Sequence, residues 1–164
     1  YNIDKKFFLS LLKLINKKKR NFFFKLALYY PCNFEINVLK VLEHNNISSQ
    51  DILLPVTEKR SHMNFFSWRK NDVLLVNKFG ILEPVKTRAK VPDFMLVPIL
   101  AFDKNKFRLG YGKGFYDRYL SKYLKRYKNI LTIGVAFSFQ KYHKLPVNKD
   151  DVKLDFILTE KGIF

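Results

Sequence analysis

The sequence predicts a single α/β domain of three layers, with a mainly parallel central sheet flanked by helices. Strand-like apolar segments alternate with helix-like segments along most of the chain, which is typical of such sheets. The chain has 164 residues, of which 48% are hydrophobic and 16% aromatic, enough to bury one core and to exclude a disordered protein. We therefore expect one domain spanning residues 1–164.

The first part of the chain contains two predicted helices and one predicted strand. Apolar residues at helical spacing in 7–15, followed by the basic run Lys17–Arg20, predict an amphipathic surface helix with positive charge at its C-terminus. The dense apolar segment 21–30 ends at Pro31 and predicts a buried strand. Helical spacing in 34–42 predicts a second helix.

The middle of the chain combines short strands with an irregular segment. A strand is expected over 52–56 and a second over 62–68, after a polar turn. Segment 77–92 is the least regular, because it is interrupted by Gly80, Pro84 and Pro92. Irregular segments of this length in compact domains are usually functional or mobile.

The last part contains three predicted strands and one predicted helix. Strands are expected over 94–101, 130–137 and 156–159. A helix starting near Phe115 follows from the spacing of Tyr116, Leu120, Tyr123, Leu124 and Tyr127. In open parallel sheets ligands gather at the carboxyl ends of the strands, where the glycine-rich segment before this helix is expected to lie.

The net charge is strongly positive, at +17 from 31 Lys plus Arg against 14 Asp plus Glu. Such a field attracts polyanions. However, Lys17–Arg20 is the only run of four basic residues, and no recognised nucleic-acid motif accompanies the charge. A basic nucleic-acid-binding protein is therefore a minor alternative, and no nucleic-acid partner is expected.

Membrane insertion and disulfide bonding are not expected either. The longest apolar stretch, 22–31, is interrupted by Lys25 and has about half the roughly 20 residues that a membrane helix needs. No signal peptide is recognised, and the single cysteine, Cys32, permits no internal disulfide. We expect a cytoplasmic protein.

The glycine-rich segment predicts an anion site. Gly110, Gly112 and Gly114 can adopt positive φ, so that successive N–H groups point into one concavity, and the following helix adds its N-terminal dipole. Lys113 and Arg108 supply full positive charge. The spacing fits neither the Walker pattern nor the dinucleotide fingerprint, and a simple tight turn between strand and helix is the structural alternative.

The order of short segments along the chain is more specific than any one of them. It resembles the 5-formyltetrahydrofolate cyclo-ligase family, also called methenyltetrahydrofolate synthetases, from about Asn21 to the C-terminus. The segments that carry the resemblance are Leu54–Pro55, His62–Phe65, Glu83–Pro84, Val97–Asp103, Arg108–Leu120, Ile133–Phe137, Gln140, Leu145–Val147, Asp150–Asp151 and Asp155–Glu160.

The resemblance implies a ligase that uses ATP and Mg²⁺ to convert 5-formyltetrahydrofolate into 5,10-methenyltetrahydrofolate, with release of ADP and phosphate. Lys113 and Arg108 would neutralise charge on the transferring phosphoryl group, and Asp117 and Asp151 match the magnesium positions. The nucleotide would contact Arg108, Leu109, Gly110, Tyr111, Gly112, Lys113, Gly114, Phe115 and Tyr116.

The resemblance also implies a folate site. Glu35 matches the substrate-binding carboxylate of the family, and Trp68 joins the expected apolar wall for the pterin. The other expected substrate contacts are Tyr30, Met63, Phe65, Tyr111 and Phe115. Structural alternatives remain at three places: Glu35 could favour a helix dipole, Met63 and Phe65 could be core residues, and Asp151 could lie in a solvated turn.

Two departures from the family pattern affect these expectations. The family begins with a basic helical segment whose lysine and arginine reach the ATP. This sequence starts at Tyr1 without it, so we expect either that these residues are missing, which would weaken ATP binding, or that they lie outside this sequence. Phe115 stands where the family usually has Tyr. A non-catalytic member that binds folate or nucleotide is thus the main alternative. The expected protein is a monomer whose substrate carries either one glutamate or a polyglutamate tail.

Overall fold

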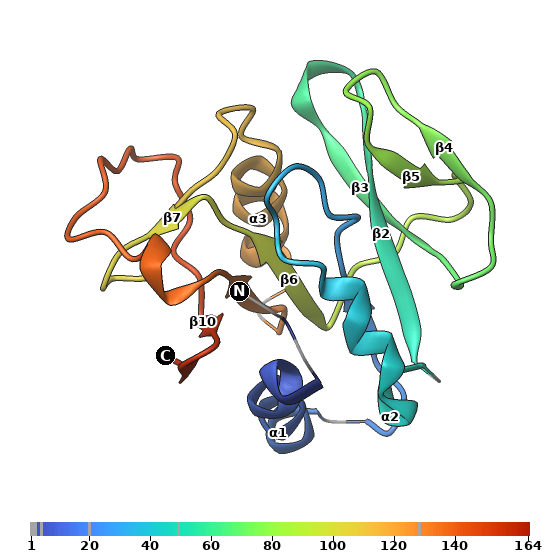
Figure 1. Ribbon diagram of the computed structural model, residues 1–164. Coiled ribbons are helices and arrows are strands. Elements are labelled where there is room, and N and C mark those ends of the chain that lie inside the picture. The colour runs from blue at the N-terminus through green and yellow to red at the C-terminus, as the bar shows by residue number, and fades with distance from the viewer. Residues whose placement is uncertain (1–2, 4, 20, 49, 128) are drawn as a thin grey trace.

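A seven-stranded sheet forms the centre of the computed structural model, which describes residues 3, 5–19, 21–48, 50–127 and 129–164 (Figure 1). Its strands lie in the order β11 (Gly162–Ile163), β10 (Phe156–Thr159), β9 (Leu131–Val135), β6 (Phe94–Pro98), β1 (Lys25–Ala27), β2 (Asp51–Thr57) and β3 (Met63–Ser67). The five strands from β10 to β2 are mutually parallel, and only the edge strands β11 and β3 are antiparallel. The predicted α/β architecture is confirmed.

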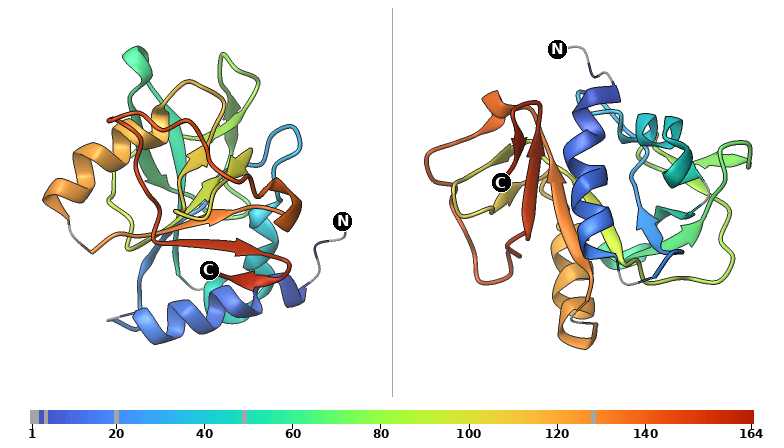
Figure 2. Two further views of the ribbon diagram at one scale, coloured as in Figure 1. Left: turned by 90° about the vertical axis from the view of Figure 1, so that its left-hand side faces the viewer. Right: turned by 90° about the horizontal axis from the view of Figure 1, so that it is seen from below.

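Helices cover both faces of this sheet (Figure 2). On one face lie the 3₁₀ turn η1 (Lys5–Phe8), α1 (Leu9–Lys18), the 3₁₀ helix η2 (Val38–Glu43) and the short α2 (Asn45–Ser48). The other face is covered by α3 (Phe115–Arg126). Each face has its own apolar cluster, so the molecule has the three predicted layers.

The predicted first helix forms because its apolar side chains share one face. Phe8, Leu11 and Ile15, at helical spacing, are at most 1% exposed. Lys17 and Lys18 follow in the last turn, where positive charge is favourable. Arg20, the end of the predicted basic run, lies outside the described residues.

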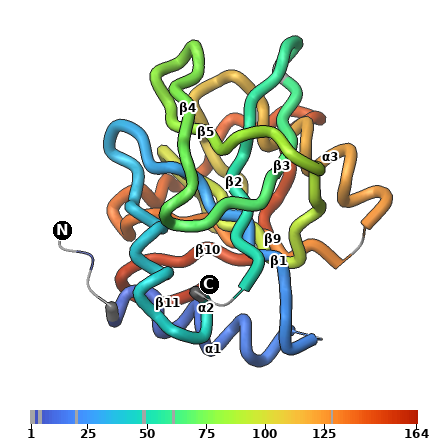
Figure 3. Tube along the Cα trace, turned by 90° about the vertical axis from the view of Figure 1, so that its right-hand side faces the viewer, coloured from blue at the N-terminus to red at the C-terminus, as the bar shows by residue number. Residues whose placement is uncertain are grey.

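Short hairpins extend from the strand ends. One joins β4 (Leu74–Val76) to β5 (Leu82–Pro84), a second joins β7 (Ala101–Phe102) to β8 (Arg108–Leu109), and the 3₁₀ turn η3 (Lys59–Ser61) connects β2 to β3. A further 3₁₀ turn, η4 (Ser138–Gln140), follows β9. Figure 3 shows the β4–β5 hairpin beside β2 and β3. The segment predicted to be irregular therefore contains an ordered strand, β5.

Two predicted elements are wrong in extent. The strand expected over 21–30 is limited to β1, since Phe22 and Phe23 precede the sheet in a bend and are 72% and 68% exposed. The helix expected from residue 34 begins only at Val38, where the Asn37 side chain accepts the Leu39 N–H at 3.1 Å. Apolar density led to both errors, because it does not reveal which aromatic side chains stay in solvent.

Among the residues that the structure describes, none of the helices combines the length and the apolar character that a membrane span requires.

Candidate functional site

A cavity of about 980 Å³ opens at the carboxyl ends of β1, β2 and β6. Its walls come from the loops that follow these strands, from the β4–β5 hairpin and from the start of α3. This is where ligands bind in parallel α/β sheets. The lining includes Tyr29, Tyr30, Cys32, Glu35, Pro55, Thr57, Met63, Asn77, Phe79, Glu83, Pro98, residues 108–117, Pro146, Asn148 and Asp151.

The glycine loop, defined as Gly110–Gly114, lines one wall with unpaired main-chain donors. Gly112 and Gly114 have φ of 79° and 64°, in the left-handed region that favours glycine. Within the described part of the chain, the N–H groups of Tyr111, Gly112 and Lys113 have no hydrogen-bond acceptor. Three such donors before the 12-residue helix α3 are groups chemically suited to an anion.

Arg108 holds a buried positive charge beside this loop. Its side chain is 5% exposed, and Nη2 donates at 2.8 Å to Oδ2 of Asp117. The guanidinium lies over the ring of Tyr116, 5.4 Å from its centroid. Its Nε has no hydrogen-bond partner among the described residues. Arg108 therefore keeps one donor for a ligand while Asp117 fixes its position.

Two carboxylates, Asp117 in the first turn of α3 and Asp151, line the same cavity. The N–H of Val152, the next residue after Asp151, lies 3.4 Å from Oδ1 of Asp117, and Oδ2 of Asp151 accepts the N–H of Asn148 at 2.6 Å. In the described ranges, no three His, Cys, Asp or Glu side chains are grouped closely enough to hold a metal ion. The two carboxylates can therefore supply only part of a coordination sphere.

Two tyrosines leave buried hydroxyl groups in the cavity wall. Neither Tyr29 nor Tyr116 has a hydrogen-bond partner for its hydroxyl among the described residues. Burial, with the nearby charge of Glu35 as a second cause, raises the pKa of both hydroxyls, so both stay protonated at neutral pH. A buried hydroxyl without a protein partner is a group that a bound ligand would satisfy.

Glu35 lies in the loop that precedes η2 and belongs to the same lining as these hydroxyls. Its Oε2 accepts the N–H of Cys32 at 2.9 Å, and its own N–H donates to the carbonyl of Cys32 at 3.0 Å. Burial raises the pKa of Glu35, and the Cys32 hydrogen bonds oppose this shift. Burial and the charge of Glu35 raise the pKa of the Cys32 thiol to about 11, so this thiol is not an activated nucleophile.

Comparison with known proteins identifies the relatives of this chain. A model of the 5-formyltetrahydrofolate cyclo-ligase family matches residues 10–160. The chain belongs to this family. It is 30% identical to the 5-formyltetrahydrofolate cyclo-ligase of Haemophilus influenzae over 155 residues, covering 90% of this chain and 80% of that protein. For the enzyme of Escherichia coli K12 the identity is also 30%, over 84% of this chain and 79% of the relative.

Solved structures support the same assignment. The 5,10-methenyltetrahydrofolate synthetase of Mycoplasma pneumoniae superposes with a TM-score of 0.71 and 27% identity, covering 95% of this chain and 84% of that chain. The 5,10-methenyltetrahydrofolate synthetase of Aquifex aeolicus superposes with a TM-score of 0.70 and 29% identity, covering 97% of this chain and 80% of that chain. Cyclo-ligases are ATP-using enzymes, so the predicted enzyme class, the folate chemistry and the α/β fold are confirmed.

The cavity of this cyclo-ligase family member contains most of the residues predicted to line its site. Tyr30, Glu35, Met63, Tyr111 and Phe115 all belong to the lining, as do the nine predicted nucleotide contacts from Arg108 to Tyr116 and the two acids Asp117 and Asp151. Their roles remain predictions. The structure brings them together from the loop after β1, from β3 and β8, from the glycine loop and the start of α3, and from the segment before β10.

Two predicted substrate contacts lie elsewhere. Phe65 is fully buried, outside the lining, with its ring 5.0 Å from that of Tyr119 on α3. Trp68 belongs to the apolar cluster on the opposite face of the sheet. Phe65 lies on the same face of the sheet as Met63 but is covered by α3. Trp68 lies on the opposite face, because successive residues of a strand point in opposite directions. We correct both to core residues.

Glu83 had no predicted role, although the Glu83–Pro84 pair is one of the segments that carry the resemblance to the family. Glu83 is only 8% exposed and lines the cavity. Its Oε1 accepts three hydrogen bonds, from the N–H and the hydroxyl of Thr57 at 2.8 and 2.7 Å and from Nδ2 of Asn77 at 2.7 Å. A carboxylate inside an otherwise apolar segment was the signal that could have revealed it.

Proposed function

We propose that this chain catalyses the ATP-dependent conversion of 5-formyltetrahydrofolate into 5,10-methenyltetrahydrofolate, with release of ADP and phosphate. The observation that carries the proposal is the row of unpaired N–H donors in the glycine loop. The residues that carry these donors line the same cavity as Glu35, Tyr29 and Tyr116. Membership of the cyclo-ligase family supplies the identity of the two ligands that such a cavity brings together.

The reaction proceeds through a phosphorylated formyl group. The oxygen of the N5-formyl group attacks the γ-phosphorus of ATP. The bond between this phosphorus and the oxygen that leaves with ADP breaks. N10 then attacks the formyl carbon and loses its proton, while the phosphate leaves with the electrons of the C–O bond. Phosphoryl transfer depends chiefly on alignment and charge stabilisation, so a general base is not obligatory.

The glycine loop and two basic residues hold the nucleotide in this proposal. The N–H groups of Tyr111, Gly112 and Lys113 donate to phosphate oxygens. Lys113, which is exposed on the loop and without an ion pair among the described residues, neutralises the γ-phosphate. Arg108 contributes its buried charge and the unpaired Nε. These N–H groups and basic side chains thus stabilise the negative charge on the phosphoryl group during its transfer.

Asp117 and Asp151 hold Mg²⁺ in this proposal. Their oxygens are hard ligands suited to this ion, and Mg²⁺ is usually bound by one or two carboxylates together with substrate phosphates. The remaining ligands of the ion would come from the nucleotide and water. When bound, the ion would offset charge on the β- and γ-phosphates.

The folate lies between the Glu35 loop and the glycine loop. Glu35 accepts hydrogen bonds from N–H groups of the pterin, and Tyr30 and Met63 contribute to the wall around it. Tyr111 and Phe115 lie where the folate and phosphate sites join. We further propose a cytoplasmic, monomeric enzyme that accepts substrates with one or several glutamates.

The experiment that tests the proposal is a turnover assay. Folded protein incubated with MgATP and 5-formyltetrahydrofolate is expected to generate the absorbance of the methenyl product, one ADP per turnover. Calorimetric binding of both ligands without product would instead support the non-catalytic alternative. Absence of both binding and turnover in folded protein would overturn the proposal.

A further inference from the structure

A second cavity, of about 690 Å³, lies at the opposite edge of the sheet from the cyclo-ligase cavity. It opens at the amino ends of β1 and β2 and beside the end of β3, and the two cavities share no lining residue. Its size falls within the range of small-molecule sites. The proposed reaction uses none of its residues.

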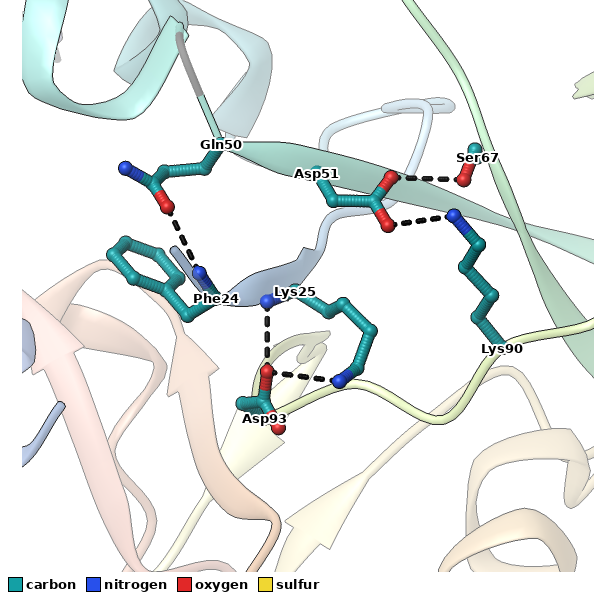
Figure 4. A network of polar contacts seen from close by, with 7 residues as sticks. All are labelled: Phe24, Lys25, Gln50, Asp51, Ser67, Lys90 and Asp93. Carbon is teal, nitrogen blue, oxygen red and sulfur yellow. Dashed lines mark hydrogen bonds and ion pairs between the residues drawn. The ribbon is translucent and has the colours of Figure 1, made fainter. Parts of the chain in front are cut away.

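The acidic groups of this second cavity are already paired. The two Asp51 oxygens accept the Ser67 hydroxyl and the Lys90 ammonium, each at 2.8 Å, as Figure 4 shows. The Asp72 carboxylate accepts the main-chain N–H of Arg69 at 2.8 Å. These carboxylates therefore have their own donors and need no cationic ligand.

The basic groups of the same cavity are not all paired. Arg69 and Lys70 are exposed in the lining, and the ion pairs of the described residues include neither of them. A planar guanidinium binds carboxylate or phosphate in a bidentate manner. In a chain with a net charge of +17, these two cations favour an anionic ligand.

Aromatic side chains supply the apolar wall. Trp68 is 5% exposed, whereas Phe23 is 68% exposed although it is a large apolar residue. The indole Nε1 of Trp68 is buried without a hydrogen-bond partner in the described part of the chain. The exposed Phe23 ring, in the same lining as the Arg69 guanidinium and the Lys70 ammonium, suits a flat ring that carries negative charge.

We propose that the second cavity binds a planar aromatic anion, with its ring against the exposed Phe23, in a lining that includes the buried Trp68, and its carboxylate or phosphate on Arg69 and Lys70. The site is separate from the cyclo-ligase reaction, so the proposal does not depend on that function. A neutral ring loses the contact with the cations, and a small inorganic anion loses the stacking. Both are expected to bind much more weakly.

The single tryptophan makes the test specific, because Trp68 is the only one in the sequence and lies in this cavity. Its fluorescence is followed while AMP or 4-aminobenzoylglutamate is added to about 5 mM, above the roughly 1 mM dissociation constant of a weak specific site. These probes distinguish a phosphate from a carboxylate ligand. A saturable change is expected with at least one of them, and none with adenosine or inorganic phosphate.

Variants separate this site from the glycine loop and from general charge. The fluorescence change is expected to persist in Lys113→Ala, which alters the glycine loop. In Arg69→Ala the affinity of the probe should fall at least about tenfold, as expected for a charged hydrogen bond. The affinity should be retained in Arg126→Ala, which removes an exposed arginine elsewhere. Cyclo-ligase turnover is expected to be unchanged in Arg69→Ala. Absence of a saturable change with both probes, or equal weakening in the two arginine variants, would overturn the proposal.

Discussion

The glycine loop and the β4–β5 hairpin line the same cavity, but main-chain N–H groups are unpaired in the loop and hydrogen-bonded in the hairpin. Tyr111, Gly112 and Lys113 leave their N–H groups without acceptors among the described residues. In the hairpin turn, by contrast, Oδ1 of Asn77 accepts the N–H groups of Phe79 and Ile81 at 2.8 and 3.0 Å. Unpaired donors indicate a surface that can hydrogen-bond to a ligand, whereas paired groups indicate a structural wall whose conformation is fixed by its own hydrogen bonds.

The two walls also meet. The rings of Phe79, at the hairpin turn, and Phe115, at the start of α3, are 6.1 Å apart in an edge-to-face arrangement. Glu83 anchors the hairpin to Thr57 at the end of β2. The hairpin is therefore held in place at the end of β2 and beside the start of α3. Substitutions that act on one wall alone can test this division of roles.

Gly112→Val is expected to have the largest effect. The residue has φ of +79°, which a β-branched side chain strongly disfavours, yet a Cβ there would meet no atom within 4 Å. The loop would change shape while the fold survives. We expect kcat/KM for ATP to fall by about 10³-fold, the effect of losing preorganised donors, measured by turnover and by calorimetric binding.

Gly80→Val is the matched control in the hairpin. Gly80 has φ of +77° and equally open surroundings, so the local strain is the same. We expect a similar loss of stability but little change in ATP affinity. If both variants weakened ATP binding equally, the glycine loop would have no special role in holding phosphate.

Lys113→Ala is expected to have the second largest effect. Removing this charge from the transferring phosphoryl group should lower kcat by about 10²-fold, with normal thermal stability because the side chain is exposed. Lys78→Ala removes an exposed lysine from the hairpin and should leave kcat near the wild-type value. Equal effects of the two substitutions would indicate that only the general positive field matters.

Glu83→Ala tests the hairpin wall. The substitution leaves the Thr57 N–H without its acceptor and should destabilise the protein by about 1–3 kcal/mol, measured by denaturant unfolding. A displaced hairpin should also raise KM for the folate about tenfold. Glu83→Gln retains an acceptor oxygen and should recover most of the stability. If Glu83→Gln lost as much stability as Glu83→Ala, the hairpin would depend on the negative charge of Glu83 rather than on its hydrogen bonds.

The different origins of these walls explain what the sequence could predict. The glycine loop is local, since alternate glycines before a helix specify their own conformation, and its position followed from the parallel sheet. The partners of Glu83 include Thr57, 26 residues away, which no local pattern links to it. Likewise, spacing predicted that Phe65 lies on a strand, but only the packing of α3 decides that it is covered.

Substitution of Glu35 is expected to have the smallest effect of those considered. The loop that carries Glu35 shares one feature with the hairpin and one with the glycine loop. Like the hairpin it is held by hydrogen bonds, here to Cys32, and like the glycine loop it is proposed to contact a ligand. Burial raises the pKa of Glu35 above the ordinary 4.5, so the folded state binds more protons than the unfolded state over the interval above that value. Ionisation of Glu35 therefore lowers the stability of the free protein as the pH rises through this interval.

Glu35→Gln should consequently be less pH-dependent in stability than the wild type, with the gain over wild type largest at the upper end of the interval. Its KM for 5-formyltetrahydrofolate should be raised about tenfold, the effect of replacing a charged acceptor. In the wild type the same KM should rise as the pH falls and Glu35 is protonated, whereas in Glu35→Gln it should stay flat. Glu43→Gln, outside the cavity, should follow the wild type, and a wild-type-like pH profile in Glu35→Gln would remove Glu35 from the folate site.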